Sequence, residues 1–431
     1  MNLDPKIMHP RDQIILAISR IYKRGLTTTS GGNISIIDES GDIWVTPSAI
    51  DKGSLRRSDI VCVKKDGTID GRHKPSSEFP FHKAIYECRP DIRAIIHAHP
   101  PGLVAFSIAR KIPDTNIIPQ AKNICGPIGY APYALPGSEK LGESIAEAFK
   151  KQFIAVIMEN HGTVIGGTDL QDTFSRFETL EFCGRTIING STIGKPVYLS
   201  DEMIHKFEEQ IPHLQPELKQ VDHPSDEREI RESIVKIVKR ACEQGLMISS
   251  YGTVSVRWRG NDFLITPTNV SRWDITQKDI VQIRDEKREP GKLPSRSVWL
   301  HQEIYKQNPH VNSIILTQPP YIMAFSVTGE KFDVRTIPES WIFLQDVPNV
   351  KFGSHFMGDS RILDVISEKT PAVIIENDSL LVTGDKILNT FDRLEVAEFS
   401  AKSLTMSKPV GTLAPINEEQ IDDLRKKFLF G

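Results

Sequence analysis

Two histidines separated by a single residue, His97 and His99, end an apolar segment that contains Ile95 and Ile96. β-branched residues favour a strand, and side chains alternate between its two faces, so both imidazoles should lie on one face. At about 3.3 Å per residue, their Cα atoms should be roughly 6.5 Å apart, which suits two ligands of one metal ion. Taken alone, the pair is equally compatible with a structural role.

Two further stretches offer ligands of the same kind. Glu78 directly precedes a segment, residues 79–88, that is expected to be helical, so its carboxylate should lie at the first turn. His161 follows an apolar segment, residues 153–158, and should lie in the turn at the end of that strand. Three imidazole nitrogens and one carboxylate oxygen form a ligand set that is typical of zinc.

The order and local context of these motifs resemble the class II aldolase and adducin family, known from L-fuculose-phosphate aldolase and L-ribulose-5-phosphate 4-epimerase. The resemblance covers about residues 11–200. It implies an α/β fold with three layers (αβα), in which a central and largely antiparallel sheet lies between helices. It also implies one divalent ion per chain, Zn²⁺ or one of Mn²⁺, Co²⁺ and Fe²⁺, held by four ligands: Glu78, His97, His99 and His161.

The composition is that of a soluble globular protein, because 39% of the 431 residues are hydrophobic and 25% are charged. A net charge of −3 gives no electrostatic reason to expect a nucleic acid or an acidic membrane as a partner. Five cysteines without a CxxC pair predict reduced thiols, and no apolar run approaches the length of a membrane span. We therefore expect a cytoplasmic protein.

The chain contains an internal repeat. Residues 75–86 match residues 294–305 in their proline, serine, histidine and tyrosine positions, a shift of 294 − 75 = 219. Motifs on either side match at shifts of 217 to 220, as expected when loops differ by a few residues. We therefore predict two tandem copies of one fold, lobe one (residues 1–214) and lobe two (residues 215–431). The proline-containing stretch at residues 211–228 should be the linker.

Periodicity and turn residues predict the same order of helices and strands in each lobe. Amphipathic helices should open the two lobes, at residues 11–24 and 227–244. The other elements expected in lobe one are strands at 34–37, 43–45 and 60–64, a strand ending at 97, a strand pair around 161, and helices after 78, at 137–151 and at 169–189.

Lobe two lacks the candidate metal ligands although it keeps the sequence around them. Their positions are occupied by Ser297, Leu316, Gln318 and Asp378. Positions that served only packing should not diverge together, so we expect lobe two to be a degenerate copy that holds no metal. His82, in contrast, is retained as His301 without ligands around it, which favours a structural role.

A Gly-Gly turn between a predicted helix and a predicted strand could bind an anion through its backbone N–H groups. On its own, such a pair indicates no more than a turn of the chain. In the resembling family, this turn and two hydroxyl-containing segments bind the phosphate of a sugar phosphate, which implies that role for Gly32, Asn33, Ser48, Ala49, Ser76 and Ser77. Lobe two has Thr253 and Arg296 in place of Asn33 and Ser77, so its pocket should be remodelled or filled.

The resemblance implies a divalent-metal-dependent aldolase, a lyase that cleaves a ketose phosphate through a metal-bound enediolate. Glu78 would leave the metal when the substrate binds and would act as the base, so it is a predicted catalytic residue as well as a ligand. Metal-dependent epimerases, decarboxylases and dehydratases of sugar phosphates or hydroxy-keto acids share the ligand set and are alternatives. A non-catalytic adducin-like scaffold, in which the ligands are typically absent, is the alternative of another class.

The aldolases of this family take a tyrosine proton donor from a neighbouring subunit, and the matching position here is Ile117. Tyr130 and Tyr133 lie nearby in the sequence and are candidates for the same role. The family also implies a ring of four lobes, so we expect a homodimer of chains. If the two kinds of lobe alternate around that ring, lobe two must supply the acid, and the shift of 219 places Glu339 in the segment concerned.

Overall fold

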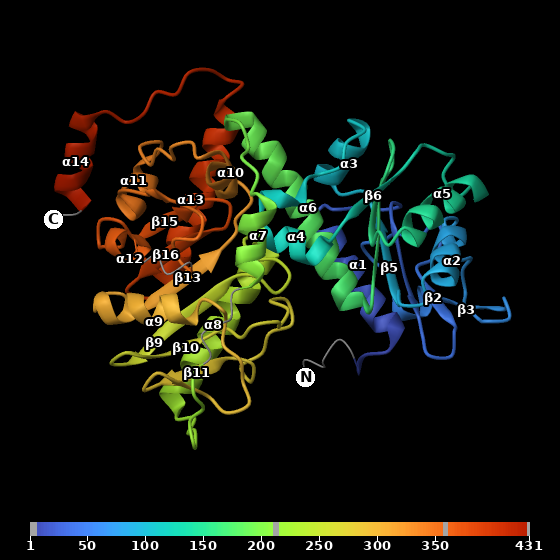
Figure 1. Cartoon of the computed structure of the whole chain (residues 1–431), viewed down its shortest axis with the longest axis horizontal. Helices are drawn as coiled ribbons and strands as arrows, with labels where there is room; N and C mark the ends of the chain where they lie inside the picture. Colours follow the sequence, from blue (N-terminus) through green and yellow to red (C-terminus); the bar gives the residue numbers. More distant parts are fainter. Residues whose placement is uncertain (1–6, 210–214, 357–360, 429–431) are drawn as a thin grey trace. The chain divides into compact units, whose positions relative to one another are not determined.

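A computed structural model describes residues 7–209, 215–356 and 361–428 of the chain (Figure 1). The chain forms two compact units. The first contains Met1–Thr115 and Gln120–Arg185, and the second contains Asn116–Pro119 and Thr186–Gly431. This division does not test the predicted boundary between the two lobes, at residues 214 and 215, which stays a prediction.

The first unit is built on an eight-stranded sheet with the strand order β4-β3-β2-β1-β5-β8-β7-β6. Neighbouring strands are antiparallel except β6 and β7, which are parallel. The strands are β1 Asn33–Ile37, β2 Ile43–Val45, β3 Val61–Val63, β4 Ile69–Asp70, β5 Ala94–Ala98, β6 Ile128–Ala131, β7 Ala155–Met158 and β8 Gly162–Gly167.

The second unit repeats this sheet in the order β12-β11-β10-β9-β13-β16-β15-β14, with β14 and β15 as the parallel pair. Its strands are β9 Thr253–Arg259, β10 Asp262–Ile265, β11 Val281–Arg284, β12 Lys287–Arg288, β13 Ser313–Thr317, β14 Asn349–Val350, β15 Ala372–Ile375 and β16 Ser379–Gly384.

Helices follow the same order in both lobes. Lobe one has α1 Pro10–Lys23, α2 Phe79–Cys88, α3 Pro101–Ile108, α4 Pro119–Cys125, α5 Glu139–Lys150, α6 Leu170–Ile193 and α7 Asp201–Glu208, with short 3₁₀ turns η2 Arg57–Asp59 and η3 Thr115–Ile117. Lobe two has α8 Ser225–Gln244, α9 Val298–Gln307, α10 Ile322–Thr328, α11 Pro338–Leu344, α12 Arg361–Val365, α13 Ile387–Ser407 and α14 Glu418–Phe428.

Alternation of side chains along the strands places a core on each face of the sheet. In lobe two, Ile315 packs with the helices α8 and α13, whereas the adjacent Ile314 packs with α9 and α12 on the opposite face. In lobe one, Ile95 on β5 belongs to the core that α2 and α5 cover through Phe81 and Ile145. Each lobe is thus a sheet between helices, as the α/β prediction states.

The predicted fold class and the tandem arrangement are confirmed, and the helices predicted at residues 11–24 and 227–244 appear as α1 and α8. The linker prediction is partly wrong, because α8 already begins at Ser225. Acidic residues in its first turn stabilise a start at that point. Residues 211–214 of the predicted linker lie outside the described residues. No described helix has the length and apolar character needed to cross a bilayer.

Candidate metal centre

His97 lies on β5 near the middle of its sheet, between Asn33 on β1 and Val164 on β8. Its side chain is fully buried, and its Nδ1 lies 2.9 Å from the carbonyl oxygen of Thr163. A carbonyl oxygen can only accept, so Nδ1–H donates to it. In the neutral imidazole, Nε2 then carries the lone pair that a metal ion requires.

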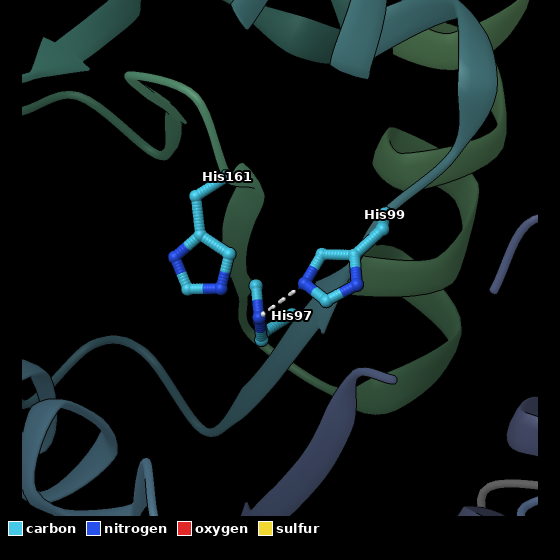
Figure 2. Close-up of side chains that lie close together, drawn as sticks. All are labelled: His97, His99 and His161. Atoms are coloured by element: carbon cyan, nitrogen blue, oxygen red, sulfur yellow. Dashed lines mark hydrogen bonds between the residues drawn. The ribbon is translucent and has the colours of Figure 1, made fainter. Parts of the chain in front are cut away.

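His99 directly follows β5, and its Nε2 lies 3.1 Å from that of His97 (Figure 2). His161 comes from the tight turn between β7 and β8, which Asn160 makes possible with a left-handed φ of 52°. The backbone N–H of His161 donates to Oγ of Ser107 at 3.0 Å and fixes the turn. The ligand atoms of the three histidines all lie within 4.8 Å of one another.

Glu78 joins this cluster from the N-cap position of α2. Its Oε2 lies 3.1 Å from Nε2 of His97, and its Oε1 lies 3.4 Å from Nε2 of His161. The side-chain amide of Asn33 donates to Oε2 at 2.8 Å. Burial raises the pKa of this carboxyl, but the charges that His97 and His161 carry when they are protonated, together with hydrogen bonds from His97 and the Asn33 amide, outweigh burial and lower it. Glu78 is therefore a carboxylate.

The donor set fits one divalent ion. Four tetrahedral ligands at about 2.0–2.1 Å from zinc would hold their donor atoms roughly 3.3 Å apart. The separations between neighbouring donors, 3.1, 3.1 and 3.4 Å, agree with that spacing. Burial lowers the pKa of His99 to about 3 and that of His161 to about 4, so both imidazoles are neutral at pH 7, as metal ligands must be.

His82 lies beside the centre and has a different role. Its Nε2–H donates to Oδ1 of Asn33, and its Nδ1 lies 2.7 Å from Oγ of Ser35, which in turn lies 2.7 Å from the hydroxyl of Tyr86. Burial lowers the pKa of His82 to about 3, so it is a neutral link in this chain. The chain orients the Asn33 amide toward Glu78, which agrees with the predicted structural role of His82.

The three segments predicted to bind phosphate lie next to one another. Ile34, after the Gly-Gly turn, donates its N–H to Oγ1 of Thr46 at 3.2 Å. The N–H of Ser76 donates to the carbonyl oxygen of Thr46 at 3.2 Å, and that of Ser48 donates to the carbonyl oxygen of Lys74 at 3.0 Å. One set of backbone contacts thus places all three segments beside β1.

The Gly-Gly turn requires glycine at its second position. Gly32 has a φ of 72°, and a Cβ there would lie 2.7 Å from the carbonyl oxygen of His97. Only glycine satisfies both conditions. Ala49 adopts a left-handed φ of 57°, and Ser77 is exposed. Because the Asn33 side chain already donates one N–H to Glu78, at most its second N–H remains for a ligand.

Sequence reasoning missed Lys52, which supports the segment after Thr46. Its side chain is buried, and Nζ donates to the carbonyl oxygen of Pro47 at 2.8 Å. Burial lowers its pKa to about 8. The internal repeat could have revealed this residue, since Arg272 lies 220 positions later and its guanidinium also donates to a proline carbonyl, that of Pro267, at 2.9 Å.

Glu181 on α6 is a second supporting residue to which the sequence assigned no role. Its carboxylate accepts the backbone N–H groups of Gly102 and Leu103, at 3.0 and 2.9 Å. These residues open α3 and directly follow the His99 segment, so Glu181 anchors the chain where it leaves the centre. Burial raises the pKa of Glu181 to about 7. Glu398 makes the same contacts with Tyr321 and Ile322 in lobe two.

Lobe two has hydroxyls, an amide and one carboxylate, that of Asp378, at the positions around the centre of lobe one. Oγ1 of Thr253 lies 2.6 Å from Oγ of Ser295 and 3.1 Å from Oγ of Ser297, and the two serine oxygens are 3.1 Å apart. The side chain of Gln318 donates to the carbonyl oxygen of Asp378 at 2.8 Å. Among the described residues, the only His, Cys, Asp and Glu cluster suited to a metal ion is that of lobe one.

The candidate proton donors lie in different parts of the chain and differ in exposure. Tyr133 is exposed at the end of the β6 segment, and burial together with the nearby Glu159 raises the pKa of Tyr130. Glu339 lies in the first turn of α11 in the second unit and is exposed. The side chain of Ile117, at the position of the family's tyrosine, is fully buried and cannot donate a proton.

The model of the class II aldolase and adducin N-terminal domain matches the chain twice, over residues 12–188 and 232–405. The two matches together span most of the chain. The chain belongs to the class II aldolase and adducin family. The two matches also confirm the tandem duplication that was predicted from the internal shift of 217 to 220 residues.

Three relatives illustrate the chemistry found among similar proteins. The 5-deoxy-D-ribulose 1-phosphate aldolase of Bacillus thuringiensis serovar kurstaki is 32% identical over 198 residues, 45% of this chain and 91% of that protein. The L-fuculose phosphate aldolase of Methanocaldococcus jannaschii is 35% identical over 172 residues, 40% of this chain and 91% of that protein. The 3-oxo-tetronate 4-phosphate decarboxylase of Escherichia coli K12 is 30% identical over 182 residues, 41% of this chain and 85% of that protein. This family member thus resembles enzymes that correspond in length to a single lobe.

Proposed function

We propose that lobe one is a divalent-metal-dependent aldolase that cleaves a ketose phosphate into a ketone phosphate and an aldehyde. One observation carries the proposal: a carboxylate, Glu78, lies within 3.4 Å of two histidines of a three-histidine cluster. Two of the relatives are aldolases of sugar phosphates, one of them of a 1-phosphate, which supports a substrate of that class. The ion, when bound, polarises the ketone and its neighbouring hydroxyl as a Lewis acid. Zinc suits the ligands, with Mn²⁺, Co²⁺ and Fe²⁺ as alternatives.

The chain's own residues bind and orient the substrate first. The phosphate is expected against the backbone N–H groups beside Gly32 and the hydroxyls of Ser48, Ser76 and Ser77. Backbone N–H groups and hydroxyls that converge on one anion fix its position without a buried counter-charge. The reacting carbons then lie toward β5 and the turn at His161.

Glu78 is the base that removes and returns the proton on the reacting carbon of the substrate. In the direction of condensation, its carboxylate removes a proton from the carbon next to the ketone of dihydroxyacetone phosphate, and that carbon attacks the aldehyde. Asn33 holds Oε2 at 2.8 Å, while Oε1 is buried and has no hydrogen-bond partner among the described residues. Oε1 is thus the oxygen available as the base. Cleavage follows the same steps in reverse.

A second group gives a proton to the aldehyde oxygen during condensation and takes it back during cleavage. Glu339 is the proposed residue, supplied by lobe two in a homodimer, and Tyr130 and Tyr133 are the alternatives within lobe one. A carboxylate at this position takes a proton from the substrate hydroxyl during cleavage and returns it during condensation. No oxidant or reductant is needed.

Decarboxylation is the second candidate reaction, because one relative is a 3-oxo-tetronate 4-phosphate decarboxylase. The same centre would stabilise the electron pair left behind by CO₂. Epimerisation and dehydration of sugar phosphates or hydroxy-keto acids need the same ion and a differently placed acid. A non-catalytic scaffold of the adducin type is disfavoured by a complete ligand set in lobe one.

The test is a substrate screen of the full chain loaded with Zn²⁺ or Mn²⁺. Ketose 1-phosphates, ketose 5-phosphates and hydroxy-keto acid phosphates are offered, and aldehyde, epimer and CO₂ are each measured. We expect aldehyde from a ketose 1-phosphate and none from the Glu78→Gln variant. CO₂ release without aldehyde would replace the aldolase by a decarboxylase, and no turnover of any class would overturn the enzyme proposal.

A further inference from the structure

Lys52 is a buried cation without an anionic partner among the described residues. Its side chain is only 3% exposed. An ammonium has three N–H groups, and one of them donates to the carbonyl oxygen of Pro47 at 2.8 Å. The other two have no acceptor in the part of the chain that the structure describes. A buried charge that is neither paired nor fully hydrogen-bonded is costly, so Lys52 lowers the stability of lobe one unless a further partner binds.

Lys52 lies between two of the three segments that are proposed to hold the phosphate. Its backbone N–H donates to the carbonyl oxygen of Thr29, two residues before the Gly-Gly turn, at 2.9 Å. Its Nζ donates to Pro47, the residue before Ser48. The positive charge is thus fixed next to the N–H groups and hydroxyls on which the anion is expected.

Arg272 occupies the same place in lobe two, and its donors are bonded within that lobe. Its backbone N–H donates to the carbonyl oxygen of Ser249 at 2.8 Å, which reproduces the backbone bond of Lys52. All three guanidinium nitrogens donate to carbonyl oxygens, those of Pro267 at 2.9 Å, Gly252 at 2.7 Å and Val270 at 2.7 Å. Both lobes thus keep a buried cation, but only the lobe with the candidate metal centre leaves donors of that cation free.

The charges around Lys52 do not neutralise it. Among the described residues, Asp51 is the one charged group that acts on the pKa of Lys52. Asp51 is exposed, and its carboxylate accepts hydrogen bonds from the N–H of Gly53 at 2.9 Å and the hydroxyl of Ser54 at 2.7 Å. Burial has the larger influence and lowers the pKa of Lys52 to about 8, so the side chain is mostly charged at pH 7 and mostly neutral at pH 9.

We propose that Lys52 supplies the positive charge that attracts the phosphate of the substrate and that it thereby selects the phosphate dianion. The inference rests on the proposed function and deepens it, because it names the residue that recognises the charge of the ligand. The N–H groups and hydroxyls of the pocket are neutral and fix the position of the anion, while Lys52 adds electrostatic attraction from beside them. Such attraction is stronger in a buried site than in water. Lys52 is therefore a specificity-determining residue and takes no part in the bond-breaking step.

Binding of the anion should then be coupled to the uptake of a proton. A dianion that binds beside Lys52 favours the charged form of the side chain and raises its pKa. At pH 8.5 a large share of the free chains has released this proton, so binding of the dianion takes it up again. Affinity for a phosphate ester should accordingly fall as the pH rises above about 8. A lysine that only supports the Pro47 segment would produce neither effect.

The test measures binding of glycerol 3-phosphate to the full chain by isothermal titration calorimetry and needs no turnover. The second pKa of a phosphate ester is about 6, so at pH 8.5 this ligand is already a dianion and changes its own protonation little. Titrations in buffers of different ionisation enthalpy give the number of protons taken up. We expect about half a proton or more per site in the wild type at pH 8.5. Lys52→Arg, whose charge is permanent, should take up none.

Substitutions separate the charge of Lys52 from its packing. Lys52→Met keeps most of the volume and removes the charge, so affinity at pH 7 should fall about tenfold or more, whereas Lys52→Arg should bind within a few-fold of wild type. Lys64→Met is the matched control, because Lys64 is a lysine of the same lobe that is already paired with Asp42 at 2.8 Å, and it should leave binding unchanged. Circular dichroism checks that each variant is folded, and the proton count of Lys52→Arg decides the question if Lys52→Met is not.

The outcomes distinguish the role of Lys52 from the proposed reaction. Binding without proton uptake in the wild type, or a folded Lys52→Met chain that binds as tightly as wild type, would overturn the role of Lys52 and leave ordered water as the partner of its N–H groups. A wild-type chain that binds no phosphate ester would overturn the phosphate pocket as well. A chain that binds the ester with proton uptake but cleaves no sugar phosphate would support Lys52 and contradict only the proposed reaction.

Discussion

Lobe one and lobe two share a scaffold and differ at the position of the metal centre. In both lobes a buried histidine, a serine and a tyrosine form the same hydrogen-bonded chain: His82, Ser35 and Tyr86 in one, His301, Ser255 and Tyr305 in the other, with every oxygen or nitrogen pair at 2.7 Å. What differs is the far side of the histidine, where Asn33 leads to Glu78 in lobe one and no described partner faces Nε2 of His301 in lobe two.

The difference shows which residues the fold needs and which the chemistry needs. A buried carboxylate that loses its partners costs several kcal/mol, so Glu78 and its imidazole partners can only be lost together. Lobe two has replaced them together, and three hydroxyls now satisfy one another. The retained histidine chain therefore belongs to the scaffold, and the replaced set belongs to the function.

Substitution of His97 should have the largest effect, and it tests the comparison between the two lobes most severely. His97→Ala should lower turnover by about a thousandfold or more, because a Lewis acid contributes several kcal/mol to the barrier. Leu316→Ala, at the same place in lobe two, should leave kcat and KM within a few-fold of wild type. Steady-state kinetics on both variants is the test. Equal losses of turnover in the two variants would mean that lobe two also takes part in the reaction.

Glu78→Gln separates the ligand role of Glu78 from its role as base. The amide keeps an oxygen for the ion but has no basicity, so turnover should fall by at least ~10²-fold while most of the metal is retained. Ser297→Ala, the control in lobe two, should change neither quantity. The base would have to be another residue if Glu78→Gln turned over substrate within a few-fold of wild type.

Ser48→Ala should act mainly on substrate binding. A hydrogen bond to a charged group contributes about 1.5–3 kcal/mol, so KM for the phosphorylated substrate should rise about tenfold or more with little change in kcat. Thr268→Ala in lobe two is the control and should have no kinetic effect. A KM unchanged by Ser48→Ala would remove Ser48 from the phosphate pocket.

The smallest expected effect concerns pH and Lys52. Its folded-state pKa of about 8 lies below the ordinary 10.5, because burial disfavours the charged form. Between these values the unfolded chain holds a proton that the folded chain has released, so the free energy of unfolding rises with pH through this window. Lys52→Met should lack this rise. Urea unfolding at pH 7.5 and pH 9.5 measures it, and parallel pH dependence in wild type and variant would contradict the burial argument.

The fold could be predicted from the sequence because the internal repeat and the pattern of apolar residues in the strands both indicate it. The helices at the start of each lobe and the strand that contains His97 depend on local periodicity, and the structure has all of them, with β5 ending at Ala98, one residue later than predicted. The cluster of His97, His99 and His161 could also be anticipated, since His97 lies near the end of a strand, His99 directly follows it, and His161 lies in the turn after another strand. Whether these residues and Glu78 bind an ion stays a prediction.

What the sequence could not show depends on contacts between distant segments. Lys52 and Glu181 lack a local motif, and their roles emerge only from backbone groups that the fold brings to them. The contact between Asn377 and Ile117 joins residues 260 positions apart. Local patterning carries no information about such pairs, so contacts of this kind are visible only in three dimensions.

The most direct test of the central claim is the number of divalent ions bound per chain. Wild-type protein is loaded with Zn²⁺, freed of weakly bound metal by gel filtration and measured by inductively coupled plasma mass spectrometry alongside His97→Ala. One ion per wild-type chain and none in the variant is the predicted result. Two ions per wild-type chain, or one ion that survives His97→Ala, would contradict the assignment of a single metal centre to lobe one.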